Sequence, residues 1–144
     1  MSRACLLLLA LSWLASACNT KPAEQRSERP AWLRAAKIEA LGAGSAFAKN
    51  SEVFLKVENP TDEPLVIQAL GSEGAASLLY TSGGRAKIHR LSVGVAKPVI
   101  VPPRGHKRTS LLFEPAQGSP TKLILYDKEF ALPAGARTGA AIAR

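Results

Sequence analysis

The chain has 144 residues, a formal net charge of +8 at pH 7 and only two cysteines. This length allows one folded domain of about a hundred residues, which is large enough to bury a core without disulfides. No internal repeat with a period of roughly 20–50 residues is present, which excludes a repeat architecture.

Residues 1–17 have the order of a secretory signal. Arg3 gives a positive start, an apolar run from Ala4 to Ala15 follows, and small residues precede Cys18. A membrane-spanning helix needs about 20 apolar residues, and this run is shorter. We therefore predict a signal peptide over residues 1–17 that is removed from the mature chain.

Cys18 is the expected attachment point of a lipid. The sequence LASAC, residues 14–18, resembles the lipobox of bacterial lipoproteins, in which the signal is cut before the cysteine and the cysteine is then acylated. The resemblance departs from the commonest pattern, because Ala15 stands where leucine is usual and Leu14 is one place earlier. Since Cys5 lies in the removed segment, Cys18 has no intramolecular disulfide partner in the mature chain. The alternative is ordinary secretory cleavage, which would leave Cys18 as a free thiol.

Residues 18–30 are predicted to link the lipid to the folded body. After Cys18 they read NTKPAEQRSERP, a polar sequence of both charge signs that cannot bury enough apolar surface to fold. As a flexible tether it would reach roughly 20 Å on average. Asn19 follows the cysteine at the position where aspartate tends to retain lipoproteins of enteric bacteria in the inner membrane. By that resemblance we expect a lipoprotein of the outer membrane that faces the periplasm.

Residues 30–42, PAWLRAAKIEALG, allow two interpretations. Pro30, the helix formers that follow it and Gly42 are typical of a short helix. The same segment also fits a strand from Ala36 to Leu41, which a loop of small residues would join to the next strand. We favour the strand, because a single helix would need a place in an otherwise all-β layer.

Residues 51–59, SEVFLKVEN, alternate between apolar and charged side chains, as expected of a half-buried strand. A turn rich in Pro, Asn and Asp leads to a second strand at residues 64–70, and the two form an arch or a hairpin. Further short apolar runs between Gly and Pro turns predict strands at residues 77–82, 86–93, 98–101, 107–114, 121–127 and 129–133. Of these segments, residues 77–82 and 87–93 are candidate exposed edges, at which a partner can add a strand.

Short strands at intervals of about ten residues predict an all-β sandwich or barrel. The stretches VENPTDEPLVI and VPPRGHKRTSLLFEPAQGSPTKLILYD resemble small immunoglobulin-like domains of envelope lipoproteins and the water-stress (type-2 late-embryogenesis-abundant) domains. The resemblance implies an immunoglobulin-like β-sandwich, for which we expect about seven or eight strands. It depends on turn and core residues, so it bears on the fold and not on the function. We place the domain at residues 31–133 and a disordered basic tail at residues 134–144.

The excess positive charge lies in one block, residues 74–113, which has seven basic and no acidic residues. In a cell envelope, a basic face can bind phospholipid headgroups, lipopolysaccharide phosphates or anionic polymers. The alternative is a solvated basic surface with no partner. The residues predicted to contact an anionic surface are Arg85, Lys87, Arg90, Arg104, Lys107 and Arg108.

No residue set in the sequence predicts a reaction or a metal site. The stretch GSEG at residues 71–74 lacks the spacing of a nucleophile elbow, and the basic block has too few aromatic residues to stack nucleic-acid bases. The turn ENPTDEP is similar to one in periplasmic copper carriers, which hold the metal through His and Met. This chain has only His89, His106 and the removable Met1, so we expect no metal and no cofactor.

These patterns together predict a lipid-anchored envelope protein that is not an enzyme. We expect a binding or assembly module whose partner is an envelope protein or an anionic surface, and not nucleic acid. A periplasmic carrier of a small ligand or of a metal of the copper type is the alternative function.

Overall fold

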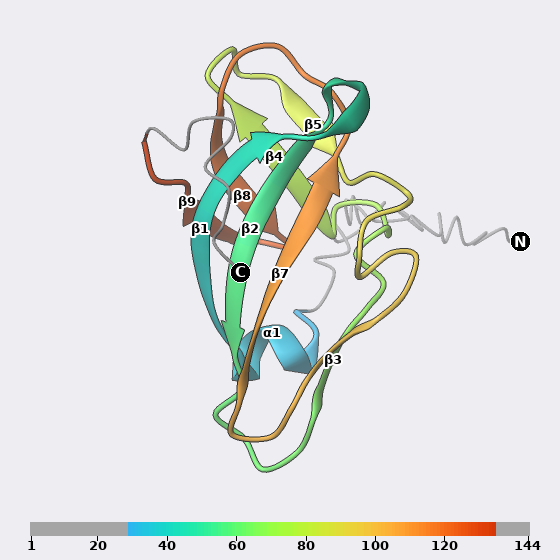
Figure 1. The fold of residues 1–144 in the computed structure, drawn as a ribbon, viewed down its shortest axis with the longest axis vertical. Helices are drawn as coiled ribbons and strands as arrows, with labels where there is room; N and C mark the ends of the chain where they lie inside the picture. Colours follow the sequence, from blue (N-terminus) through green and yellow to red (C-terminus); the bar gives the residue numbers. More distant parts are fainter. Residues whose placement is uncertain (1–28, 135–144) are drawn as a thin grey trace, which may run out of the picture.

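The computed structural model describes residues 29–134, which form a β-sandwich of nine strands and one short helix (Figure 1). One layer has the strand order β1-β2-β7, the other has the order β5-β4-β8-β9, and β3 pairs with β6 in a separate ribbon. All pairings are antiparallel. The predicted all-β sandwich is therefore confirmed, with nine strands in the described residues where we expected seven or eight. The strands are β1 (Lys37–Ser45), β2 (Ser51–Glu58), β3 (Leu65–Ile67), β4 (Ala76–Tyr80), β5 (Arg85–Lys87), β6 (Val99–Val101), β7 (His106–Phe113), β8 (Pro120–Leu125) and β9 (Lys128–Ala131).

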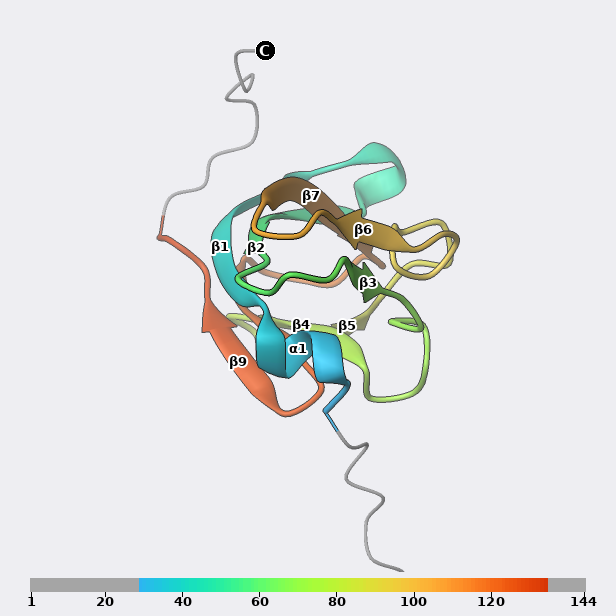
Figure 2. The ribbon, with the colours of Figure 1, turned by 90° about the horizontal axis from the view of Figure 1, so that it is seen from below.

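The two layers enclose one apolar core. On β2, Val53, Leu55 and Val57 are buried while the residues between them are half-buried, which confirms the predicted alternation. On β7, Leu111 lies in register with Val53 and Phe113 with Ser51, and both Leu111 and Phe113 are buried. The facing layer contributes buried leucines from β4 and β8. Seen from below, the β4–β9 layer and the β2–β7 layer lie on opposite sides of this core (Figure 2).

The segment of residues 30–42 contains both a helix and a strand. Helix α1 (Ala31–Ala35) begins after Pro30 and buries Trp32 and Leu33. The ring of Trp32 meets the ring of Tyr126 edge-on, with 6.4 Å between centroids. We call the end of the sandwich that holds α1 the helix end. The strand that we favoured is confirmed from residue 37 on, whereas the five residues before Ala36 are helical because their apolar side chains close the core.

Strand β1 is longer than predicted and carries a bulge. Its register against β2 shifts between Ala40 and Gly42, so Leu41 is an extra residue and is exposed. Gly42 has a φ of 152°, which suits glycine at such a bulge. The small residues that we assigned to a loop therefore continue the strand to Ser45. The hairpin then turns through a short 3-10 helix, η1 (Phe47–Lys49), in which Ala48 and Lys49 have left-handed φ angles of 53° and 61°.

The turn after β2 forms an arch and not a hairpin, because β3 pairs with β6. Asn59 fixes this arch from within, and its side chain is 1% exposed. Its amide nitrogen donates hydrogen bonds to the carbonyl oxygens of Glu63, Val101 and Pro102 at 2.7, 3.2 and 3.1 Å. Its amide oxygen accepts bonds from the backbone N–H and the hydroxyl of Thr61 at 3.0 and 2.7 Å. One buried side chain thus ties the β2–β3 turn to the β6–β7 turn.

The sandwich is closed on one side and open on the other. On the closed side, residues 87–89 continue β5 and bond to the end of β7, through Glu114 N–H to the Lys87 oxygen and His89 N–H to the Leu112 oxygen, at 2.9 and 2.8 Å. On the open side, β1 and β9 are the outer strands of their layers. The expectation of a free edge at residues 77–82 was wrong, since β4 lies between β5 and β8. The expectation of a free edge at residues 87–93 was also wrong, because residues 87 and 89 already form backbone hydrogen bonds with the end of β7.

Candidate functional site

The predicted lipidation site, Cys18, lies outside the described residues 29–134, as do the signal peptide and most of the tether. The tail predicted at residues 134–144 also lies outside them, apart from Ala134. Within the described residues, no helix has the length and apolar character of a transmembrane span. The candidate site is therefore sought on the body of the sandwich, starting from the six predicted basic residues.

The structure divides those six residues between the two ends of the sandwich. Arg104, Lys107 and Arg108 lie in the β6–β7 turn and the first residues of β7, at the helix end. Arg85, Lys87 and Arg90 lie on β5 and just after it, where residues 87–89 join the last residues of β7. Because β7 rises about 3.4 Å per residue, roughly 20 Å separates the two groups along this strand. They are not one continuous basic face.

At the helix end, Arg104 already has an anionic partner. Its Nε and a terminal nitrogen donate to the two carboxylate oxygens of Asp62 at 2.7 and 3.0 Å. These hydrogen bonds lower the pKa of the Asp62 carboxyl below its ordinary value. The pair is solvent-exposed, so its effect on stability is small, but it offsets the charge of Arg104 toward an external anion.

Arg108 lies among charges of both signs, whereas Lys107 is exposed on the other face of β7, in register with Val57. On the outer face of β1, β2 and β7, Glu39, Lys56 and Arg108 are neighbours in register. In the next row Lys37, Glu58 and His106 are neighbours. A hydrogen bond from Lys56, at 2.6 Å, and the charge of Lys56 lower the pKa of Glu58. The helix end is therefore a mixed-charge surface of cross-strand pairs.

At the other end, the basic side chains are exposed and have no ion pair within residues 29–134. We call this the hairpin end after the β1–β2 turn that lies there; the loop after β5 begins near this turn and runs down the side of the sandwich (Figure 1). Arg85 and Lys87 are exposed on either side of the buried Ala86. One acidic residue, Glu114, lies beside them, since its backbone N–H bonds to the Lys87 oxygen. Lys49 on the hairpin turn is also exposed and adds a fourth positive charge.

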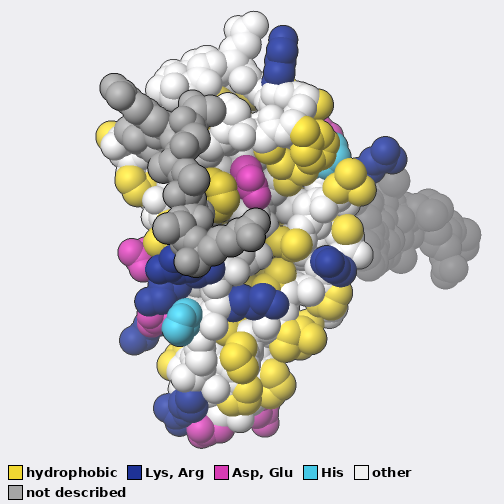
Figure 3. All heavy atoms as spheres, in the orientation of Figure 1, with side chains coloured by type: hydrophobic (Ala, Val, Ile, Leu, Met, Phe, Trp, Pro, Cys, Tyr) yellow, Lys and Arg dark blue, Asp and Glu magenta, His cyan; other side chains and the backbone are white. Residues whose placement is uncertain are grey.

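Two exposed apolar side chains, Phe47 and Leu91, lie at the same end, and the sequence analysis did not identify them. Each is 60% exposed. The ring of Phe47 meets the ring of His89 edge-on, with 6.0 Å between centroids. The Leu91 N–H donates to Nδ1 of His89 at 3.2 Å. Figure 3 shows hydrophobic side chains beside a histidine at the upper right of the molecule, with a Lys or Arg side chain near them. We define the hairpin-end cluster as Phe47, Lys49, Arg85, Lys87, Arg90 and Leu91.

The loop that presents Arg90 and Leu91 is held firmly. The hydroxyl of Ser92, which is 2% exposed, accepts the Leu112 N–H at 3.0 Å and donates to the Val93 oxygen at 3.1 Å. Gly94, at φ 81°, accepts the Leu70 N–H at 3.1 Å, and a Cβ at this glycine would lie 2.7 Å from a methyl group of Leu70. These contacts fix the loop to the end of β7 and to the core. The backbone of Leu91 is therefore held in one conformation while its side chain is exposed.

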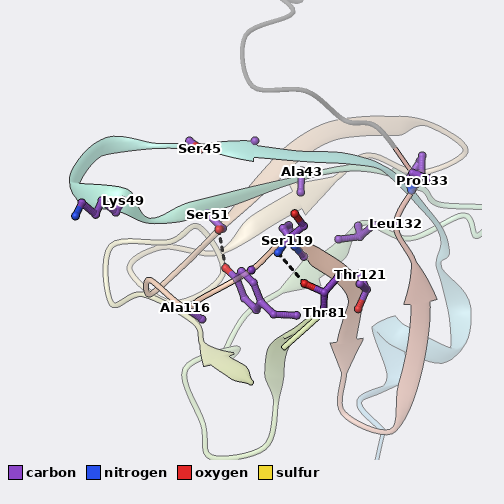
Figure 4. A pocket seen from close by; sticks show the side chains of 15 residues that line it. Ala43, Ser45, Lys49, Ser51, Thr81, Ala116, Ser119, Thr121, Leu132 and Pro133 are labelled. Atoms are coloured by element: carbon purple, nitrogen blue, oxygen red, sulfur yellow. Dashed lines mark hydrogen bonds between the residues drawn. The ribbon is translucent and has the colours of Figure 1, made fainter. Parts of the chain in front are cut away.

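A groove of about 680 Å³ lies on the open side of the sandwich (Figure 4). β1, the ends of β4 and β8, and the residues after β9 line it, and Lys49 is its one charged side chain among the described residues. Several of its hydroxyls are engaged within the protein: Tyr80 donates to Ser51 at 2.6 Å and Thr121 donates to the Leu79 oxygen at 3.1 Å. The groove therefore offers no nucleophile beside a base and no set of converging charges.

The histidines do not form a shared site. His106 begins β7, whereas His89 bonds to Leu112 near its other end. In residues 29–134 no group of three or more His, Cys, Asp or Glu side chains is placed to hold a metal ion. The nearby carboxylates serve as ion-pair partners: Glu58 of Lys56, Asp62 of Arg104 and Glu129 of Lys122.

Comparison with known proteins adds no family to this description. The chain matches no protein-family model, no curated protein and no solved structure.

Proposed function

We propose that this protein is a lipid-anchored, non-catalytic binding module of a bacterial envelope, and that it contacts an anionic surface through its hairpin end. Cys18 carries the lipid, residues 19–30 form the tether, and the sandwich is the rigid body. The residue after the cysteine, Asn19, favours the outer membrane with the body in the periplasm. The contact is reversible and electrostatic, and it lets the anchored body hold a neighbouring surface or assembly close to the membrane.

One observation supports the choice of surface: the two groups of basic residues differ in the carboxylates around them. Arg104 is bound by Asp62, and Arg108 lies in a row with Glu39 and Lys56, beside the row that contains Glu58. Lys107 and Arg108, like Arg85, Lys87 and Arg90, are exposed and have no ion pair in the part of the chain that the structure describes. The carboxylates at the helix end reduce the attraction of that end for a polyanion. The proposal therefore favours the three basic residues at the hairpin end.

A pair of matched double variants tests this proposal. The exported full-length chain carries Cys18→Ser, so that no lipid contributes to binding, and is mixed with vesicles of phosphatidylcholine and phosphatidylglycerol. Arg85→Ser with Arg90→Ser should weaken vesicle binding about thirty-fold at low salt, since each basic residue near an anionic membrane contributes about 1 kcal/mol. Lys107→Ser with Arg108→Ser removes the same charge at the helix end and should weaken it by less than about five-fold.

Salt gives the second readout of the same experiment. Exposed charges are screened over about 10 Å at 0.1 M salt, so binding of the unsubstituted body should fall steeply between low and physiological ionic strength. Equal losses in the two double variants would refute the assignment to the hairpin end. Binding that does not respond to salt would refute an electrostatic contact altogether.

A further inference from the structure

The hairpin end combines exposed cations with exposed apolar side chains, and this combination restricts the kind of anionic surface that fits it. Among the large hydrophobic residues exposed in residues 29–134, Phe47 and Leu91 have the highest exposed fraction, 60% each. They come from opposite layers: Phe47 from the β1–β2 turn and Leu91 from the loop after β5. The Phe47 ring packs on the His89 ring, and the backbone N–H of Leu91 bonds to Nδ1 of the same histidine, so both residues lie close to His89.

We infer that Phe47 and Leu91 insert into the boundary between headgroups and acyl chains of an anionic lipid bilayer while Lys49, Arg85, Lys87 and Arg90 bind its headgroups. This inference depends on the proposed function and names the surface: a bilayer and not a polymer. A bilayer presents anionic groups directly above hydrocarbon, and basic residues flanking aromatic and leucine side chains are typical of surfaces that bind it. A sugar or phosphate polymer presents anions without hydrocarbon, so Leu91 would gain nothing from it.

The fixed backbone of this end makes insertion favourable. The bonds of Ser92 and Gly94 hold the loop that carries Leu91, so little conformational entropy is lost when its side chain is buried. The turn that carries Phe47 contains two consecutive non-glycine residues in the left-handed region, which the hairpin maintains at some cost in free energy. Both apolar side chains are therefore presented before any bilayer is met.

The lipid anchor and the hairpin end can contact the same bilayer. Ten residues lie between Cys18 and Arg29, and the eleven Cα–Cα steps between these two residues span at most about 40 Å. Strand β2, which runs between the two ends of the sandwich, is roughly 27 Å long. The tether is thus long enough for the sandwich to lie along the membrane that holds the anchor.

The test uses the exported full-length chain with Cys18→Ser and a further double substitution, Phe47→Ser with Leu91→Ser. Burying one such side chain raises an affinity roughly ten-fold or more, so this variant should bind phosphatidylcholine–phosphatidylglycerol vesicles about a hundred-fold more weakly. Its retention on heparin, an anionic polymer without hydrocarbon, should not change. The matched control is Val66→Thr with Ile100→Thr, which alters two exposed apolar residues paired on the β3–β6 ribbon and should leave vesicle binding unchanged.

The pattern of losses separates this inference from the proposed function. Insertion is refuted, and the electrostatic contact stands, if the apolar variant binds vesicles as well as the unsubstituted body does while Arg85→Ser with Arg90→Ser weakens vesicle binding. Equal weakening on vesicles and heparin refutes the bilayer as the specific surface. If the unsubstituted body binds neither vesicles nor heparin, the proposed function fails as well.

A fluorescence measurement tests insertion without depending on affinity. In the mature chain, from which Trp13 is removed with the signal peptide, Phe47→Trp puts a reporter at the tip of the hairpin end, and Trp32, which is 8% exposed in the core, supplies a constant background. Lipids brominated on the acyl chain should quench the added emission on vesicle binding, and the mature chain with Trp32 as its one tryptophan should show no quenching. Bound protein whose tip tryptophan is not quenched would contradict insertion.

Discussion

Replacing Phe113 by alanine should lower the free energy of unfolding by roughly 3–5 kcal/mol, the range for deleting a buried phenylalanine. Phe113 is 0% exposed and ends β7 at the point where the two layers meet. It pairs with Ser51 of β2 on one side and with Ile88 on the other. Its ring therefore fills the core where residues 87–89 join the two layers, and its removal leaves a cavity there.

Urea unfolding of the full-length chain with Cys18→Ser measures this effect. The adjacent residue gives the control, because Leu112 is on the outer face of β7 and is half-buried. Leu112→Ala should cost roughly 1 kcal/mol or less, since fewer apolar contacts are lost. Similar losses for the two variants would show that the core is not organised around Phe113.

Replacing Asn59 should cost roughly 2–4 kcal/mol, because the substitution leaves several buried polar groups without partners. Asn59→Ala removes a donor from three carbonyl oxygens and an acceptor from Thr61. Asn59→Asp keeps the shape but faces a carboxylate toward those three oxygens. We expect the loss in Asn59→Asp to be at least as large at pH 7 and smaller near pH 4, where protonation of the new carboxyl restores one donor.

Thermal or urea unfolding at the two pH values tests this network. Pro60→Ala changes the next residue, which is exposed in the same turn, and should change stability by less than about 1 kcal/mol. If Asn59→Ala were as mild as Pro60→Ala, the buried amide would not be what joins the two turns.

The local patterns of the sequence predicted most of the strands but not which strands pair, and the strand expected at residues 86–93 ends at Lys87. The alternation of Val53, Leu55 and Val57 predicted β2 because it depends only on neighbours two residues apart. The pairing of β3 with β6 and the bonds from Asn59 to residues 101 and 102 depend on contacts more than thirty residues apart. Sequence reasoning recognised Asn59 as a turn residue, which is correct, but no local signal shows that its amide is buried.

The candidate site shows the same limit. The basic block is continuous in sequence, but residues 85–90 and 104–108 lie at opposite ends because a long connection through β6 returns the chain to the helix end before β7 begins. Phe47 was hidden in a run of small residues, and Leu91 in a segment that we assigned to a strand. A phenylalanine in a turn of glycines and alanines was the one available signal, because such a position offers no core to bury it.

The lipid on Cys18 is the claim on which the proposed location and role both depend. Mass spectrometry of the N-terminal peptide from the mature protein, isolated from membranes of the native host or a bacterial expression host, tests it most directly. We predict a chain that begins at Cys18 and carries a diacylglycerol group, with a further acyl chain on its amino group. A mature chain with an unmodified Cys18, or one that begins at another residue, would contradict the account.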